Sequence, residues 1–242
     1  MKNSIYSTTA GMLTSAERLN VTANNLANFN TTGFKSDLTF EQTIKFLDEG
    51  PYPGKDQPIL GGTMVNPLQG VIQNTGRKLD LALDGPGFFT VQTPNNQELY
   101  TRNGSFTLNS KKELVNQDGY LILDKFNKKI TVYGNKLEIT PRGDIMIDDA
   151  YYTTLKIINI SGRENMEKVG TMFFKTKNSQ TPPTMLTEPN IVSGALEHSN
   201  VNLLEGLAET SAAQRTFDFQ RTAADLIFRN LRRSITDVPR PM

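Results

Sequence analysis

The spacing of apolar residues changes twice along this chain, from a helical period to an alternating one and back. Over residues 5–30 an apolar residue recurs every seven positions, and small residues fall four positions after the first three of these. Such 4-3 spacing predicts an amphipathic helix with a narrow seam, on which small residues allow a second helix to approach closely. The seam consists of Ile5, Met12, Leu19 and Leu26, with Thr9, Ala16 and Ala23 beside them.

The segment after this helix is rich in turn-forming residues. The helix is expected to end near Asn28 to Thr32, and Gly33 can supply the left-handed conformation that closes a helix. Residues 37–48 are interpreted as a short helix or an irregular segment. Residues 50–70 carry many glycines and prolines, which is typical of a linker or an extended excursion.

From about residue 71 the apolar residues alternate with polar ones, which predicts short strands. Leu79–Leu83 is expected to be one strand. Two hairpins are predicted, Phe88–Thr93 with Leu99–Arg102, and Ser105–Leu108 with Glu113–Asn116. Short strands at this spacing indicate a β-rich domain. Further strands are expected at 120–123, 130–133, 137–140, 144–148, 154–160 and 169–174.

A second long helix is predicted near the end of the chain. Ser199 or Asn200 is a suitable N-cap residue for it. Arginines are concentrated at its far end, where the helix dipole favours cations. Its two apolar rows are Val201, Leu204 and Ala208, and then Phe219, Ala223 and Leu226.

The predicted fold class is α+β, with terminal helices that pair as a coiled-coil-like core and a β-rich domain between them. The apolar stripes of the helices could be buried within one molecule or between molecules, and the pattern leaves both open. The expected divisions are 1–35 for the N-terminal helix and turn, 36–74 for an extended linker, 75–190 for the β-rich domain, 191–235 for the C-terminal helix and 236–242 for a tail.

Composition excludes several function classes. The net charge of +1 gives no electrostatic case for a nucleic-acid or anionic-membrane partner, and the absence of cysteine excludes thiolate chemistry and disulfides. No apolar segment is long enough to span a membrane. The N-terminus lacks the apolar run of a secretory signal, so any export is expected to proceed without a cleaved signal peptide.

Catalytic chemistry is poorly represented. His198 is the single histidine, and its neighbour Ser199 is badly placed to act with it on one reacting atom. Gly85, Pro86 and Gly87 lack the spacing of a phosphate loop, and no calcium-binding loop is present. We therefore expect neither an enzyme nor a bound cofactor or metal.

Three groups of residues resemble the signatures of bacterial flagellar rod and hook proteins, in the order of that family and over nearly the whole chain. The opening group is Ala23–Asn28 with Thr32–Lys35. The central group is Thr75–Leu83, Gly85, Gly87–Phe89 and Tyr100–Phe106. The closing group is Ser193–Glu197, Ser199–Asn202, Gln214, Arg215 and Phe217.

The resemblance implies a structural subunit of the flagellar basal-body rod, located in the periplasm, whose terminal helices pair into an inner tube around a channel. It implies self-association, other rod or hook subunits as partners, and passage through the flagellar type III export apparatus. The short stretches 36–62 and 161–190 are similar to the proximal rod type. Distal rod or hook protein is the alternative, and an extracytoplasmic β-domain binding protein or a cytosolic coiled-coil scaffold belongs to a different class.

We expect the terminal helices to be disordered or loosely paired before assembly and to become ordered on docking. Asn24, Asn25 and Asn28 are hypothesised to hydrogen-bond the turn or a neighbouring helix. The complete set expected at the assembly interface is Ile5, Met12, Leu19, Asn24, Asn25, Leu26, Asn28, Gly33, Phe34, Val201, Leu204, Gln214, Arg215, Phe219 and Leu226.

Overall fold

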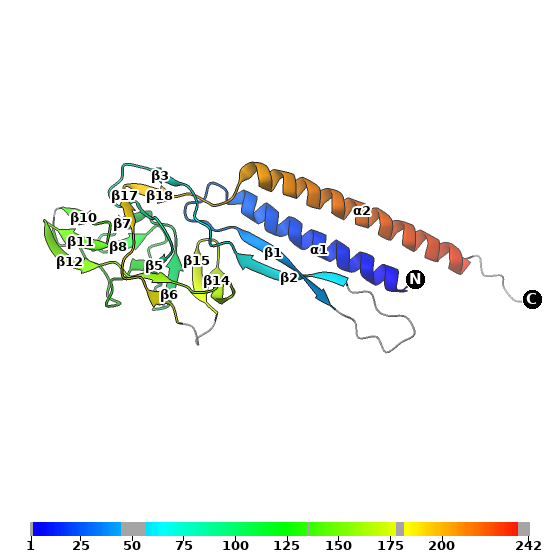
Figure 1. Ribbon diagram of the computed structural model, residues 1–242, viewed down its shortest axis with the longest axis horizontal. Helices are drawn as coiled ribbons and strands as arrows, with labels where there is room; N and C mark the ends of the chain where they lie inside the picture. Colours follow the sequence, from blue (N-terminus) through cyan, green and yellow to red (C-terminus); the bar gives the residue numbers. More distant parts are fainter. Residues whose placement is uncertain (1, 45–56, 135, 178–181, 237–242) are drawn as a thin grey trace, which may run out of the picture. The chain divides into compact units, whose positions relative to one another are not determined.

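The computed structural model describes residues 2–44, 57–134, 136–177 and 182–236 (Figure 1). The chain divides into two compact units. The first, called here the helical unit, takes residues from 1–27, 37–63 and 202–242. The second, called here the β body, takes residues 28–36 and 64–201.

Two long helices dominate the helical unit, α1 (Lys2–Ala27) and α2 (Leu203–Thr236). They lie side by side in Figure 1 and run antiparallel. The Ser15 hydroxyl of α1 donates to Oε1 of Gln220 at 2.9 Å, whereas Leu26 lies beside Gly206. Higher numbers on one helix therefore meet lower numbers on the other. The prediction of two long terminal helices is confirmed, while pairing of the coiled-coil type stays a prediction.

The start of α2 differs from the predicted N-cap. Neither Ser199 nor Asn200 caps the helix, because Asn202 does: its Oδ1 accepts from the backbone N–H of Leu204 at 3.1 Å. The Ser199 hydroxyl accepts instead from the N–H of Val201, and the Asn200 side chain is bound to the segments around residues 36 and 66–68. Tertiary hydrogen bonds thus remove both candidates from the capping position.

The segment after the first turn is a strand, so the prediction of a helix or irregular structure at 37–48 was wrong. β1 (Asp37–Ile44) pairs with β2 (Gln57–Val65) in a two-stranded sheet. The Asn25 side chain binds both the N–H and the C=O of Asp37, at 2.9 and 2.8 Å, as a neighbouring strand would, and this fixes the extended start of β1. Residues 45–48 of that prediction, and 50–56 of the predicted excursion, lie outside the described residues.

The β body contains one large sheet, and its strands follow the order β14-β15-β6-β5-β9-β8-β7, with β13 and β16 attached through β5. Both predicted hairpins are confirmed, because β5 pairs antiparallel with β6 and β7 pairs antiparallel with β8. The bounds are β5 Phe88–Gln92, β6 Glu98–Thr101, β7 Phe106–Leu108, β8 Leu114–Asn116, β9 Leu121–Ile122, β13 Ile157–Asn159, β14 Met166–Val169, β15 Phe173–Thr176 and β16 Thr184–Met185.

Smaller sheets complete the β body. A three-stranded sheet joins β10 (Leu137–Ile139), β11 (Asp144–Ile147) and β12 (Ala150–Thr154). In two antiparallel ribbons, strands from residues 191–197 pair with strands from residues 72–83. The pairs are β3 (Ile72–Asn74) with β18 (Ala195–Glu197), and β4 (Leu81–Leu83) with β17 (Ile191–Ser193).

Several predicted strand limits were wrong. The strand expected at 130–133 is reduced to an isolated bridge between Glu113 and Thr131, and β12 was not predicted. The single strand expected at 169–174 is two strands, β14 and β15, because Gly170 adopts a left-handed conformation (φ +69°) and turns the chain. A short 3-10 helix, η1 (Arg163–Asn165), precedes β14.

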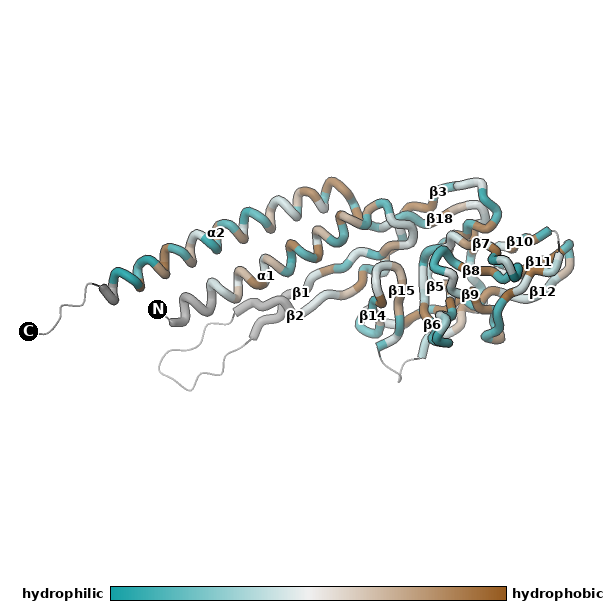
Figure 2. The backbone as a smooth tube through the Cα atoms, turned by 180° about the vertical axis from the view of Figure 1, so that it is seen from behind, coloured by the Kyte–Doolittle hydropathy of each residue, from teal (hydrophilic) through white to brown (hydrophobic). Residues whose placement is uncertain are grey.

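The apolar core belongs to the β body, where the hydrophobic strand segments alternate with polar turns (Figure 2). Phe89 and Phe106 meet edge to face within it, with ring centroids 5.1 Å apart. The fold class α+β with a β-rich centre is confirmed. The core cluster contains Leu81, Leu83, Phe89, Val91, Leu99, Phe106, Leu114, Ile122, Ile130, Ile139, Ile145, Leu155, Ile157 and Ile191.

Asp80 holds the loop before β4 through a buried carboxylate. Burial alone would raise the pKa of this carboxyl. Hydrogen bonds from Arg77, Thr75 and Ser105, together with the charge of Arg77, lower the pKa by more than burial raises it, so it lies below the usual 3.8. The Thr75 hydroxyl donates at 2.6 Å and Arg77 Nε at 2.9 Å. These bonds are stronger with the ionised carboxylate as acceptor than with the protonated acid.

The lowered pKa of Asp80 predicts an acid-dependent loss of stability. A carboxyl whose pKa is lower in the folded chain stabilises the fold above its unfolded pKa and stops doing so as the pH falls through the folded value. Urea midpoints measured at about pH 6 and about pH 3 should therefore decline less for Asp80→Asn than for the wild type. Equal declines would show that Asp80 does not carry this dependence.

Candidate assembly interface

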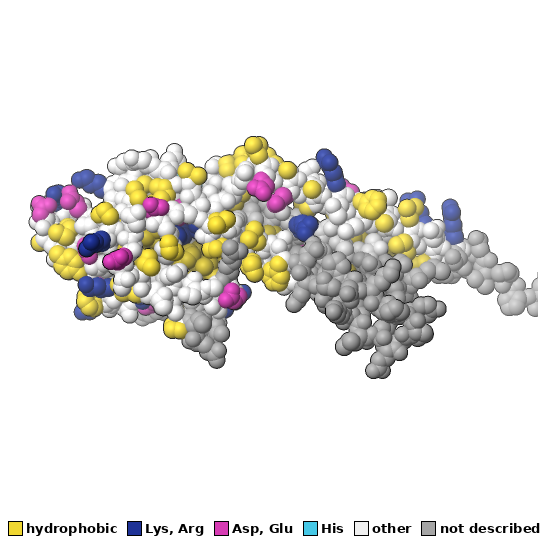
Figure 3. Space-filling model, viewed as in Figure 1, with side chains coloured by type: hydrophobic (Ala, Val, Ile, Leu, Met, Phe, Trp, Pro, Cys, Tyr) yellow, Lys and Arg dark blue, Asp and Glu magenta, His cyan; other side chains and the backbone are white. Residues whose placement is uncertain are grey.

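Several large apolar side chains of the helical unit lie on the outside. Leu204 is 77% exposed, Phe219 76% and Leu13 67%, and further exposed apolar residues lie along α2. In Figure 3, hydrophobic side chains form separate patches along the helices. The buried side chains in the described part of the two helices are small or polar: Ser15, Thr22 and Ala213. A helix pair of this composition gains little from its own seam.

Helix geometry separates the two faces of α2. At about 100° per residue, Leu204, Phe219 and Leu226 fall within a sector of roughly 60°, whereas Gly206 and Ala213 lie roughly opposite. Gly206 and Ala213 are buried, and Gly206 lies against Leu26 of α1. The three large residues, called here the outer row, therefore point away from α1. Leu226 is 54% exposed, so the whole row is accessible in the single chain.

The other predicted interface residues of the helices are distributed over both faces. Met12, Leu19 and Leu26 are half-buried, and Asn24 is exposed. Gln214 and Arg215 are exposed, with the Gln214 amide donating to Asp218 at 3.3 Å. Ile5 lies within α1, but its side chain is outside the described residues. None of these positions is tested by the fold alone, and their role in assembly stays a prediction.

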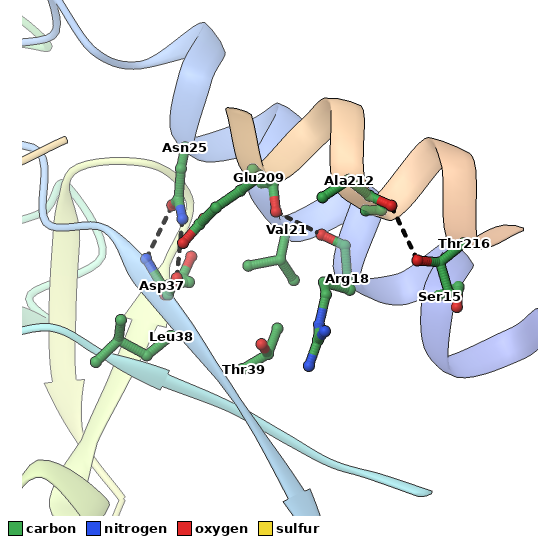
Figure 4. Close-up of a pocket in the computed structure, with 12 residues that line it drawn as sticks. Ser15, Arg18, Val21, Asn25, Asp37, Leu38, Thr39, Glu209, Ala212 and Thr216 are labelled. Carbon is green, nitrogen blue, oxygen red and sulfur yellow. Dashed lines mark hydrogen bonds between the residues drawn. The ribbon is translucent and has the colours of Figure 1, made fainter. Parts of the chain in front are cut away.

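A polar groove of about 430 Å³ lies between α1, β1 and α2 in the helical unit (Figure 4). Figure 4 shows Asn25 reaching from α1 to the backbone of Asp37. The Ser15 hydroxyl in its wall is bound to Gln220, and no histidine lines the groove. The lining therefore pairs no nucleophile with a base. The lining residues are Ser15, Arg18, Val21, Thr22, Asn25, Asp37, Leu38, Thr39, Glu209, Ala212, Ala213 and Thr216.

The hypothesis for the asparagines holds in part. Asn28 Oδ1 accepts from the Thr31 hydroxyl at 3.1 Å, so Asn28 bonds the turn as expected. Asn25 bonds a strand rather than a turn or a helix. The structure therefore gives both side chains a role in directing the chain where α1 ends.

Gly33, Phe34 and Val201 belong to the β body and are not part of the outer row. Phe34 is 1% exposed, with the Lys168 ammonium 4.3 Å from its ring centroid. The N–H of Gly33, which has a left-handed backbone (φ +71°), donates to the C=O of Glu197 at 2.7 Å. Val201 is half-buried. In the single chain these residues serve the fold of the β body.

A buried ionic cluster in the β body joins the three signature groups, and the sequence did not predict it. Lys35 Nζ lies 2.6 Å from Glu197 Oε1, and Arg102 Nη1 lies 3.2 Å from Glu197 Oε2. The side chains of Lys35, Arg102 and Glu197 are 1%, 3% and 1% exposed. Burial lowers the pKa of Lys35 and of Arg102, and the nearby Glu197 carboxylate opposes this for both.

Hydrogen bonds around this cluster tie together three stretches of chain. The Lys35 ammonium also donates to the C=O of Leu68 at 2.6 Å, and the N–H of Gly70 donates to Glu197 Oε1 at 2.9 Å. Asn200 accepts from the N–H of Ser36 and donates to the C=O of Leu68. The signal available in the sequence was that Lys35, Arg102 and Glu197 each lie in a different signature group.

Known proteins that are similar to this chain in sequence are flagellar basal-body rod proteins. A model described as "Flagella basal body rod protein" matches residues 5–35, and one described as "Flagellar hook protein FlgE/F/G D1 domain" matches residues 82–161. The flagellar basal-body rod protein FlgG of Bacillus subtilis is 31% identical, over 90% of this chain and 92% of its own length. The chain belongs to the flagellar basal-body rod protein family.

Relatives of two types are found at similar identity. The basal-body rod protein FlgF of Caulobacter vibrioides is 32% identical over 90% of both chains, and FlgG of Borreliella burgdorferi is 27% identical over 92% of this chain. Identity thus favours neither type. Within this rod-family chain, the part that the structure describes contains no helix long and apolar enough to cross a membrane. The same described residues form no cluster of three or more potential metal ligands.

Proposed function

We propose that this chain is a structural subunit of the flagellar basal-body rod that assembles with further copies and with other rod or hook subunits through its terminal helices. The observation that carries the proposal is the outward position of Leu204, Phe219 and Leu226 on a helix pair whose buried residues are small or polar. Large exposed apolar side chains that share one face of a helix are candidates for a surface that another protein covers.

The energetics favour assembly over a stable isolated helix pair. Full burial of one large apolar side chain contributes about 1.5–3 kcal/mol. Because the three side chains are 54–77% exposed, covering the outer row would contribute roughly 3–6 kcal/mol per subunit before the entropy of docking is subtracted. The same side chains contribute almost nothing while they face water. The helical unit is thus expected to gain most of its stability from neighbours.

A shaft that transmits torque requires many interlocked contacts and a central channel rather than a catalytic centre. The proposed role is therefore mechanical and not enzymatic, and the proposed location is the periplasmic rod. Delivery through the flagellar type III export apparatus is part of the same proposal. What supports these points is the membership of the rod family.

We further propose the proximal position in the rod, as in relatives named FlgF. Support comes from chain lengths, because the stretches 36–62 and 161–190 leave little room for extra outer structure. The test is a small tag inserted between Asn95 and Asn96, which lie exposed in the turn between β5 and β6. Purified hook–basal bodies would then be labelled and examined by electron microscopy.

Each position of the label has a definite meaning. Label on the membrane-proximal part of the rod supports the proximal position. Label near the hook junction makes this chain a distal rod protein, as in relatives named FlgG. Absence of the tagged protein from basal bodies that are otherwise intact would overturn the proposal of an axial subunit.

A further inference from the structure

The C-terminal stretch 191–200 completes the β body. Its two short strands supply the partners of β3 and β4, and the N–H of Gly194 donates to the C=O of Asp80 at 2.7 Å. The same stretch carries Glu197, whose carboxylate reaches both Lys35 and Arg102. Lys35 and Glu197 are 162 positions apart in the chain. The segment 191–200 therefore supplies both backbone hydrogen bonds and the carboxylate of the ionic cluster.

Without this segment the cluster has no anion. Two cations are buried, and within the described part of the chain Glu197 is the one carboxylate that reaches them. An unpaired cation buried in the protein has a much higher free energy than the same cation in water. Until Glu197 arrives, the favourable state for Lys35 and Arg102 is a hydrated one, and a hydrated Lys35 or Arg102 is incompatible with the closed β body.

The cluster is also satisfied incompletely, which limits what it adds to stability. Arg102 Nε and Glu197 Oε2 make no hydrogen bond, although Oε2 lies within ion-pair distance of Arg102 Nη1. Buried pairs with such geometry contribute little net stability, whereas the loss of one partner is strongly destabilising. A cluster of this kind adds little stability when it is complete, but it strongly disfavours any folded state in which one of its partners is missing.

We propose that the Lys35–Arg102–Glu197 cluster makes closure of the β body conditional on the segment 191–200. The chain is synthesised from its N-terminus, so Lys35 and Arg102 emerge long before Glu197. A chain that lacks its last fifth would keep both cations hydrated and its β body open. The inference goes beyond the proposed function, since it concerns how a single chain folds and holds for any polymer that the chain forms.

The test is Glu197→Gln in the full chain, which keeps the size of the side chain and removes its charge. The folding equilibrium constant, from urea titration, should fall by about two to four orders of magnitude. Hydrogen exchange should accelerate throughout the β body, including the core amides of Phe89, Leu114 and Ile122. The matched control is Glu167→Gln, which removes the partner of Lys175 in an exposed pair and should change the constant by less than about fivefold.

The pattern of hydrogen exchange shows whether the cluster controls closure of the whole β body or only holds the segments that contact it. Acceleration limited to residues 33–36, 66–70 and 197–200, with the core amides unchanged, would overturn the proposal. If Glu197→Gln does not fold at all, the triple variant Lys35→Met, Arg102→Met and Glu197→Leu keeps the proposal testable. It should fold more stably than Glu197→Gln, because no charge is left unpaired, although the N–H of Gly70 loses its acceptor. A triple variant that is no more stable than Glu197→Gln would show that the unpaired charges do not govern closure.

Discussion

Phe219→Asp is expected to abolish incorporation of the chain into the rod while leaving the chain folded. The side chain is 76% exposed, so the folded single chain loses few contacts when the ring is removed. In an assembled shaft the same position would be covered, and an unpaired carboxylate buried there costs several kcal/mol in every subunit. Motility of cells that carry the variant, and its amount in purified basal bodies, give the measurement. Circular dichroism of the purified chain reports whether it is folded.

Two companion variants make this result specific to the outer row. Phe219→Leu keeps an apolar side chain and should allow assembly. Arg221→Asp places the same carboxylate on α2 at an exposed position roughly 200° around the helix, and it should interfere much less. Normal motility with Phe219→Asp would count against an assembly surface at this row.

The helices and the two central hairpins could be predicted from the sequence because their signals are local. Helix α1 follows from apolar spacing alone, and the turn between β5 and β6 follows from its polar residues. The cap of α2 could not be chosen in this way. Ser199, Asn200 and Asn202 are all good N-cap residues, and the contacts of Asn200 with Ser36 and Leu68 leave Asn202 as the cap.

Strand β1 shows how a long-range contact overrides a local impression. Its Leu38 and Phe40 alternate with polar residues, but the segment 37–48 is interpreted from sequence as a short helix or an irregular segment. The Asn25 side chain, twelve residues earlier, binds both backbone groups of Asp37 and starts the strand. A signal of this kind is visible only after α1 has been placed beside β1.

The residues of the candidate interface could be predicted from the sequence, but their arrangement in space could not. The apolar rows of α2 were recognised, but periodicity does not say which face of a helix meets its partner. Gly206 and Ala213 allow α1 to approach closely, and this close approach leaves Phe219 outside. The ionic cluster was not predictable, because charged side chains are almost always solvated and only the fold reveals a buried one.

Gly33→Ala is expected to be among the most destabilising single substitutions in the β body. A Cβ at this position would lie 2.4 Å from the backbone nitrogen of Asn103 and 2.6 Å from the carbonyl carbon of Arg102. Backbone atoms cannot swing aside as a side chain can, so the two segments must separate. The left-handed conformation of Gly33 adds further strain. Together these costs predict a loss of about 2–5 kcal/mol in the free energy of unfolding.

Gly76→Ala separates the two contributions. Gly76 has nearly the same φ, +73° against +71°, but a Cβ there would meet no atom within 4 Å. Its substitution should therefore cost only the strain of a left-handed alanine, about 1–2 kcal/mol. Urea denaturation of both variants gives the comparison. A loss at Gly33 no greater than at Gly76 would mean that the segments around Gly33 and Asn103 are free to move apart. Arg102 directly precedes Asn103, and Lys35 follows Gly33 by two residues. Such freedom would therefore mean that the contacts of Lys35 and Arg102 with Glu197 do not hold these two segments together.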